Sequence, residues 1–216
     1  MARRGGPEAE RRARGDQTRR ALIDAARELF ADPGYFETSA TDIVERAGVG
    51  TRGAFYHHFT DKAALFRVVF EEVEQDLIRR AMSSPGPDDP FDRLTAAFGG
   101  FLDGALQPEV QRIMLIDGTA VLGWEARRAI EEHNSLAAIE EVLRRAMADG
   151  TIEPQPTREL TQILVAALEE AALLVARSED GDEARHRTGL VLDQILQGLR
   201  PPAHSSDRSR TEGVAR

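Results

Sequence analysis

Four side chains able to donate hydrogen bonds to a nucleic acid lie close together between residues 51 and 57: Thr51, Arg52, Tyr56 and His57. The planar guanidinium of Arg52 can donate two parallel hydrogen bonds to O6 and N7 of a guanine in the major groove, which would identify that base. Tyr56, His57 and the hydroxyl of Thr51 suit phosphate oxygens, whose contacts fix register on DNA without reading its sequence. The chemistry that this segment predicts is therefore recognition of a nucleic acid.

Two short helices joined by a tight turn would bring these donors to one surface. Ser39 is a good N-cap, and Asp42, three residues later, can complete a capping box, so we expect the first helix to begin there. Gly48 should end that helix, because the turn needs a positive φ that glycine adopts at little cost. Two small residues would let the second helix approach the floor of a groove: Gly53 and Ala54.

This layout is that of a helix-turn-helix, whose second helix enters the major groove of DNA. Phe55 and Phe59 are then expected to face the core of the domain. Two short helices with a glycine turn also occur in all-α proteins that never contact DNA. In that alternative, Tyr56 would be another core aromatic and Arg52 a solvated surface group.

The stretch from residue 16 to residue 66 resembles the first part of TetR-family transcriptional repressors. The similarity rests on motifs that follow the family's order: 18–30, 34–39, 47–49, 53–59 and 61–66. The first motif is similar to the family's first helix, and the second is similar to its loop into the second helix. One departure is that residues 50–52 fill a space that usually holds two residues. Either Thr51 or Arg52 could therefore be the residue that reaches a base.

The resemblance implies a homodimer that binds an inverted-repeat operator in double-stranded DNA and leaves it when an unknown small-molecule effector binds. An activator of the same fold is the alternative that these residues leave open. The resemblance also implies phosphate contacts for Thr41, Tyr56 and Lys62, the last being the only lysine in the chain. Without that role, Lys62 would be a solvated surface lysine. The expected DNA contacts are Thr41, Thr51, Arg52, Gly53, Ala54, Tyr56, His57 and Lys62.

The composition is that of a globular protein, with 41% hydrophobic residues among 216. The absence of cysteine excludes disulfides and a thiol nucleophile. The formal net charge is −9, but the first 62 residues carry +1 and the remainder −10, so the acidic part should lie away from DNA. No apolar run is long enough to span a membrane, and the N-terminus lacks an apolar signal core. We therefore expect a cytoplasmic protein.

Helical patterns continue through the rest of the chain without a convincing strand, so we expect an all-α fold. A three-helix DNA-binding domain with the helix-turn-helix at 16–62 should join a helical effector-binding and dimerisation domain at 63–200. A disordered basic arm at 1–15 and a disordered tail at 201–216 should flank them. Outside the helix-turn-helix, the expected helices span about 16–31, 61–82, 90–107, 108–122, 124–149, 157–178 and 182–199.

The last two expected helices carry more apolar surface than packing on one face requires. The stripe on 157–178 comprises Leu160, Ile163, Leu164, Ala167, Leu168, Ala171, Leu174 and Val175. The stripe on 182–199 comprises Leu190, Val191, Ile195, Leu196 and Leu199. Two such helix pairs, one from each subunit, would form a four-helix bundle and hence a homodimer. Packing within a single chain is the alternative.

An effector pocket is expected in the middle region. Its candidate residues are Phe98, Gly99, Gly100, Phe101, Met114, Trp124, His133 and Asn134. Aromatic and methionine side chains make adaptable walls, and glycines leave space. Asp103 or Asp117 could pair with a cationic ligand. The alternatives are that the apolar residues belong to the core and that His133 and these acids are solvated.

A helical enzyme is the competing function. The 5 histidines include no pair at i, i+4, and the adjacent His57 and His58 would point about 100° apart on a helix. The chain also lacks the His-Glu-x-x-His, phosphate-loop and Gly-x-Ser-x-Gly motifs. We therefore expect no catalytic residues, no metal site and no cofactor.

Overall fold

The computed structural model describes residues 7–83, 88–131 and 136–202. All regular secondary structure in these ranges is helical, which confirms the all-α fold. The N-terminal helices are α1 (Pro7–Ala31), α2 (Ala40–Ala47), α3 (Arg52–His58), α4 (Lys62–Met82) and α5 (Pro90–Gly104). They are followed by α6 (Pro108–Val110), the π-helix η1 (Gln111–Asp117), α7 (Gly118–Glu131), α8 (Ala137–Ala148), α9 (Thr157–Ala176) and α10 (Gly181–Gln197). Within the described ranges, none of the helices is both long and apolar enough to cross a membrane.

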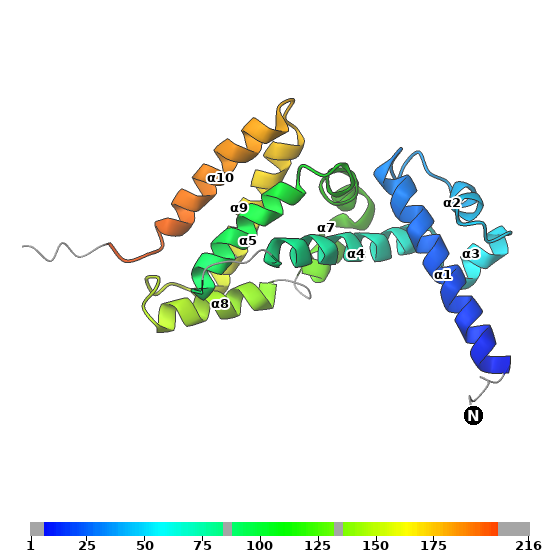
Figure 1. The fold of residues 1–216 in the computed structure, drawn as a ribbon, viewed down its shortest axis with the longest axis horizontal. Helices are drawn as coiled ribbons and strands as arrows, with labels where there is room; N and C mark the ends of the chain where they lie inside the picture. Colours follow the sequence, from blue (N-terminus) through cyan, green and yellow to red (C-terminus); the bar gives the residue numbers. More distant parts are fainter. Residues whose placement is uncertain (1–6, 84–87, 132–135, 203–216) are drawn as a thin grey trace, which may run out of the picture.

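The chain forms a small head and a larger helical body, which α4 joins (Figure 1). The head consists of α1, α2, α3 and their loops, and the body consists of α5 to α10. Within the head, α2 and α3 pack on each other and on α1. α4 begins at the head and runs into the body, where it packs along α5. α9 and α10 lie side by side in the part of the body far from the head.

One continuous apolar core extends from the head into the body. Phe30 of α1, Phe55 of α3 and Phe66 of α4 are fully buried, and the rings of Phe30 and Phe66 are 5.3 Å apart. The buried face of α4 then continues through Val69, Phe70, Val73 and Leu77 towards the body. The domain boundary that the sequence predicts after residue 62 therefore falls in the first turn of a helix that both parts share.

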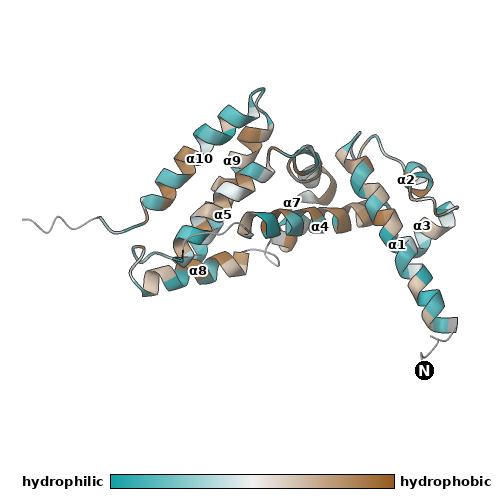
Figure 2. Cartoon of the chain, in the orientation of Figure 1, coloured by the Kyte–Doolittle hydropathy of each residue, from teal (hydrophilic) through white to brown (hydrophobic). Residues whose placement is uncertain are grey.

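α1 begins earlier than the sequence predicts. The disordered arm expected at 1–15 is wrong for residues 7–15, which form the first turns of this helix. Pro7 suits the first helical position, and the alanines, glutamates and arginines that follow are strong helix formers. This end of α1 is exposed and hydrophilic, so local propensity supports it (Figure 2). Residues 1–6 and 203–216, which include most of the expected disordered tail, lie outside the described residues.

One of the helices expected in the body is not a single regular α-helix. The segment 108–122 is divided into α6, η1 and the start of α7. The described parts of the helix expected at 124–149 are helical, as the end of α7 and as α8, and residues 132–135 lie outside the described residues. The boundary expected between 122 and 124 is present as a bend within α7, where Gly123 has a φ of 74° in the left-handed region. The other expected helices are present, with ends that differ by a few residues.

Candidate nucleic-acid interface and ligand cavity

The turn between α2 and α3 has the geometry that the sequence predicts. The Ser39 hydroxyl accepts a hydrogen bond from the Asp42 N–H at 3.2 Å, and the Asp42 carboxylate accepts one from the Ser39 N–H at 2.8 Å, so the capping box is confirmed. These hydrogen bonds hold the pKa of Asp42 below its usual value. Gly48 ends α2 with a φ of 65°, as predicted. The start of α3 is thereby fixed against α2.

The phenylalanines of α3 and of its C-cap face the core, and the polar side chains of α3 face outward. Phe55 and the following Phe59 are buried, as predicted. Tyr56 is 53% exposed, and Arg52 and His57 are exposed as well. The alternative in which Tyr56 is a core aromatic is therefore wrong. The outer face of α3 carries donors suited to bases and phosphates.

The first turn of α3 leaves its backbone and its N-cap accessible. Thr51 is the N-cap, but its side chain makes no capping hydrogen bond, so its hydroxyl can serve a ligand. A Cβ added at Gly53 would meet only the Thr51 Oγ1, at 3.6 Å, which shows open space in front of the helix. Ala54 and Thr41 are half-buried. Thr51 and Arg52 are adjacent at this end of α3, so both remain candidates for reading a base.

Lys62 has partners inside the protein. Its ammonium donates hydrogen bonds to the carbonyl oxygens of Tyr35 at 2.7 Å and Thr38 at 2.6 Å. The same ammonium lies 3.9 Å from the centre of the Tyr35 ring. Burial lowers the pKa of Lys62, and nearby Asp42 opposes that shift. Lys62 is thus not a solvated surface lysine, and its ammonium faces protein carbonyls where the sequence predicts a phosphate contact.

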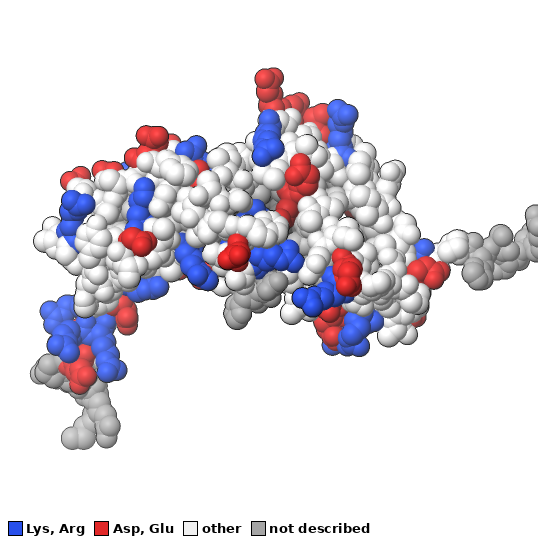
Figure 3. Space-filling model, turned by 180° about the vertical axis from the view of Figure 1, so that it is seen from behind, with Lys and Arg blue, Asp and Glu red and all other residues white. Residues whose placement is uncertain are grey.

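Basic side chains cluster on the exposed start of α1, most of them in the segment 1–15 that was expected to be a disordered arm. The cluster comprises Arg11, Arg12, Arg14 and Arg19. In Figure 3, blue side chains gather on this projecting end of the molecule. Burial, together with the positive charge of His57 and Arg19, lowers the pKa of His58 beside it. A positive surface next to α3 suits a polyanion.

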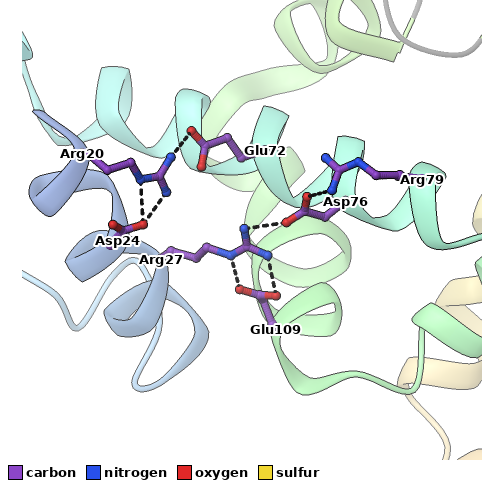
Figure 4. A network of polar contacts seen from close by, with 7 residues as sticks. All are labelled: Arg20, Asp24, Arg27, Glu72, Asp76, Arg79 and Glu109. Carbon is purple, nitrogen blue, oxygen red and sulfur yellow. Dashed lines mark hydrogen bonds and ion pairs between the residues drawn. The ribbon is translucent and has the colours of Figure 1, made fainter. Parts of the chain in front are cut away.

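An ion-pair network joins the head to the body (Figure 4). Arg27 of α1 donates to Glu109 of α6 at 2.5 and 2.9 Å, and to Asp76 of α4 at 2.8 Å. Burial alone would raise the pKa of Asp76, but hydrogen bonds from Arg27 and Arg79 outweigh it and hold that pKa below its usual value. Figure 4 also shows Arg20 of α1, which donates hydrogen bonds to Asp24 of the same helix and to Glu72 of α4.

A mainly apolar cavity of about 480 Å³ lies between α4, α5, η1, α7, α8 and α9. Three of the predicted pocket residues line it: Phe98, Phe101 and Met114. The charged residues of its described lining are Glu74, Arg93, Arg127 and Glu169. Arg127 pairs with Glu169 at 3.0 Å. The size and lining fit a small, mostly apolar molecule.

Other predicted pocket residues do not belong to this cavity. Trp124 is 61% exposed and lies 5.8 Å from the guanidinium of Arg128, because the bend at Gly123 redirects the residues after it. Gly99 and Gly100 lie outside the lining, and Gly100 instead lets α5 pack closely on Ala81. His133 and Asn134 lie outside the described residues.

The two aspartates considered for a cationic ligand have protein partners. Asp103 pairs with Arg185 of α10 at 2.5 Å. Asp117 is 2% exposed and accepts hydrogen bonds from the Tyr35 N–H at 2.9 Å and from Arg112 Nε at 3.2 Å. Neither carboxylate lines the apolar cavity. Sequence reasoning missed the contact between Asp117 and Tyr35, which joins residues far apart in the chain.

α9 and α10 expose part of their apolar stripes. The inner members pack within the body: Leu160, Leu164, Leu168, Ala171, Val175 and Leu196. The outer members, which are 45% to 65% exposed, are Ile163, Leu174, Leu190, Val191 and Ile195. The other two members, Ala167 and Leu199, are partly buried and pack against the core. Packing within one chain therefore leaves five of the thirteen predicted residues exposed.

Two family models match the chain. The model for bacterial regulatory proteins of the tetR family matches residues 22–69, which include α2 and α3. The model for the tetracyclin repressor-like C-terminal domain matches residues 91–199, which include the cavity and the exposed stripes.

Individual proteins are similar over various lengths. The HTH-type transcriptional repressor Rv1474c of Mycobacterium tuberculosis is 28% identical over 182 residues, covering 84% of this chain and 92% of that protein. The regulator AcrR of Shigella flexneri is 32% identical over 117 residues, and the match spans 53% of this chain and only 51% of that protein. The crystal structure of a TetR-family transcriptional regulator from Pectobacterium atrosepticum has a TM-score of 0.76 and 31% identity, covering 88% of this chain and 97% of the other.

Proposed function

Because this chain belongs to the TetR family of transcriptional regulators, we propose that it is a ligand-responsive repressor. As a homodimer, it binds an inverted repeat in double-stranded DNA, and it leaves this operator when a small molecule occupies the apolar cavity. The family is one of regulators and not of enzymes. Activation of transcription from the same operator is the alternative.

The outer face of α3 is the observation that carries this proposal. Thr51 and Arg52 stand at its exposed start, where the second helix of a helix-turn-helix meets base edges. Tyr56, His57 and Thr41 supply phosphate contacts, and the arginines on the start of α1 add further ones. Gly53 and Ala54 allow close approach to the groove. The internal partners of Lys62 favour a supporting role for that residue.

The exposed stripes on α9 and α10 support the homodimer. Large apolar side chains gathered on two adjacent helices are unfavourable in water unless a partner covers them. A second copy would bring identical stripes, and two antiparallel helix pairs form a four-helix bundle. Twofold symmetry would then place two α3 helices against two half-sites of an inverted repeat.

The cavity supports an effector, and α4 supplies a route from it to the DNA. Glu74, Ile78, Ala81 and Met82 of α4 line the cavity, while Lys62 begins the same helix in the head. With 21 residues, α4 is about 30 Å long. A small tilt of α4 at the cavity would therefore shift the head and change the spacing of the two α3 helices.

The test is selection of bound duplexes from a random-sequence pool by the full-length protein. We expect enrichment of an inverted repeat whose half-sites lie one helical turn apart, or a multiple of it. Affinity for the selected duplex should fall steeply with salt concentration. A pool without any enriched sequence would contradict the proposal.

A second experiment separates repression from activation. The selected duplex is placed at the promoter of a reporter gene, and the protein is supplied in increasing amounts. We expect reporter expression to fall. A rise in expression would establish the activator instead. Screening compounds by thermal shift then identifies effectors, since a ligand at 100 times its Kd stabilises by about 2.7 kcal/mol.

A further inference from the structure

The loop between α1 and α2 is bound from two sides. On the head side, the Lys62 ammonium holds the carbonyl oxygens of Tyr35 and Thr38 at 2.7 and 2.6 Å. On the body side, the Asp117 carboxylate accepts the Tyr35 N–H at 2.9 Å. Thr38 also closes the loop on itself, because its hydroxyl donates to the Gly34 carbonyl at 2.8 Å. The loop is therefore a stiff unit that leads directly into the N-cap of α2.

The body side of this loop is a closely fitted contact. Asp117 is 2% exposed, and a carboxylate this deeply buried is costly unless hydrogen bonds and a cation compensate it. Arg112 supplies the cation, with Nε 3.2 Å from the Asp117 carboxylate. The Arg112 guanidinium lies against Gly34, where an added Cβ would come within 2.2 Å of Nη2. Gly34 has a φ of 114°, a backbone conformation that favours glycine.

Asp117 and Arg112 belong to η1, and this helix also reaches the cavity. Met114 and Leu115, between them in the sequence, line the cavity. A π-helix is a less regular arrangement than an α-helix and often occurs at functional sites. One short helix therefore contacts the space for a small molecule and the loop that positions α2.

We propose that Asp117 is a positioning residue for operator binding, acting through the Tyr35 N–H to hold the loop and hence α2 and α3 in register with DNA. This inference rests on the proposed function and adds a second route to the one along α4. A molecule that displaces Met114 or Leu115 moves η1, and η1 carries the Asp117 carboxylate with it. The loop then shifts as a unit, because Lys62 and Thr38 keep it stiff.

The experiment compares wild type, Asp117→Ala and Asp117→Asn, with Asp103→Ala as the matched control. Asp103 also forms a carboxylate–arginine pair, but its partner Arg185 lies on α10 and not in the head. Binding to the duplex selected by the wild type is measured by fluorescence anisotropy. Exchange of the Tyr35 amide is followed by NMR, and cavity binding is measured with the fluorescent probe N-phenyl-1-naphthylamine.

We expect Asp117→Ala to weaken operator binding about tenfold or more, within the range of typical coupling between sites. Its Tyr35 amide should exchange faster, while the probe should bind within about twofold of wild type. Asp117→Asn keeps a neutral acceptor whose hydrogen bond is roughly half as strong, so its operator affinity should fall about threefold. Asp103→Ala should match wild type in all three measurements.

Two results would overturn the inference: unchanged operator affinity in Asp117→Ala, or weakened affinity with an unchanged Tyr35 amide. Loss of probe binding would also overturn it, since the aspartate would then support the body as a whole. If Asp117→Ala does not fold, Asp117→Asn decides, and wild-type affinity in that variant overturns the inference. Failure of the wild type to select any duplex would instead refute the proposed function.

Discussion

Arg52 stands exposed at the first position of α3, with a guanidinium that can bind a guanine through two hydrogen bonds. Arg52→Ala should therefore reduce operator affinity by about 1–3 kcal/mol and relax the preference at one base pair in each half-site. Binding to a panel of single-base variants of the selected duplex measures both effects. Arg67→Ala, which removes an exposed arginine from α4, is the control for charge alone.

A uniform loss across that panel would place Arg52 among the phosphate contacts. Thr51 would then be the better candidate for reading the base, since its hydroxyl makes no capping hydrogen bond.

Lys62 is predicted to act on stability more than on phosphate binding. Lys62→Met keeps the aliphatic stem but leaves the carbonyls of Tyr35 and Thr38 without their charged donor. Hydrogen bonds to a charged group contribute about 1.5–3 kcal/mol each to the stability of the fold, so the midpoint temperature of thermal unfolding should fall clearly. The slope of log affinity against log salt should stay unchanged. A slope that decreases by about 1 would restore the phosphate contact that the family resemblance implies.

At the scale of single residues, the sequence predicts those whose role depends on neighbours in the chain. Ser39, Asp42 and Gly48 behave as their types and spacing indicate, because caps and turns are local structures. The contacts of Lys62 and Asp117 with the loop between α1 and α2 could not be assigned from the sequence, since Tyr35 and Thr38 are 24 or more residues away from them.

The contact between α1, α4 and α6 depends on Arg27, whose side chain is 21% exposed. Arg27→Met should leave Asp76 and Glu109 near each other without their shared cation, and destabilise the protein by about 1–3 kcal/mol. Chemical denaturation measures this loss. Arg144→Met, which removes an exposed arginine paired within α8, should cost less than about 1 kcal/mol. Equal losses of unfolding free energy in the two variants would show that the Arg27 network stabilises the protein no more than an exposed ion pair does.

The same network should respond to acid. The pKa of Asp76 lies below its ordinary value of 3.8 in the folded protein, so the unfolded chain binds more protons as pH falls. The stabilisation is fully present above pH 3.8 and is lost as the pH falls through the lower folded value. Arg27→Met should therefore show a smaller decrease in stability over that acid range than the wild type. Parallel curves for the two proteins would contradict this assignment.

At the scale of helices, the sequence predicts those bounded by strong signals. Asp89 and Pro90 begin α5, and Gly48 ends α2, where the structure has them. The bend at Gly123 falls between the helices expected at 108–122 and 124–149, because glycine adopts a positive φ at little cost. The early start of α1 is missed because a charged composition resembles that of a disordered segment.

For the molecule as a whole, a single chain presents one outer face of α3 and one set of exposed apolar stripes. The cavity lies between these two surfaces, bounded by α4 and η1 towards the head and by α9 towards the stripes. The overall division into head and body followed from the motifs and the apolar patterns. The cavity lining did not, because it combines residues from six helices.

Replacing Ile163 and Val191 together by glutamate should divide the homodimer. These side chains are 65% and 56% exposed in one chain, so the substitutions should leave the fold of the subunit unchanged. In the bundle, however, each new carboxylate would be buried against apolar partners without a cation. Sedimentation should show monomers at concentrations where the wild type is dimeric. Operator affinity should fall about 100-fold or more, because each half-site is then bound independently.

Gln75→Glu, at an exposed position of α4, adds the same kind of charge away from the stripes and should remain dimeric. A double variant that sediments as a dimer would exclude the α9 and α10 stripes as the subunit contact. Another surface would then have to set the spacing of the two α3 helices.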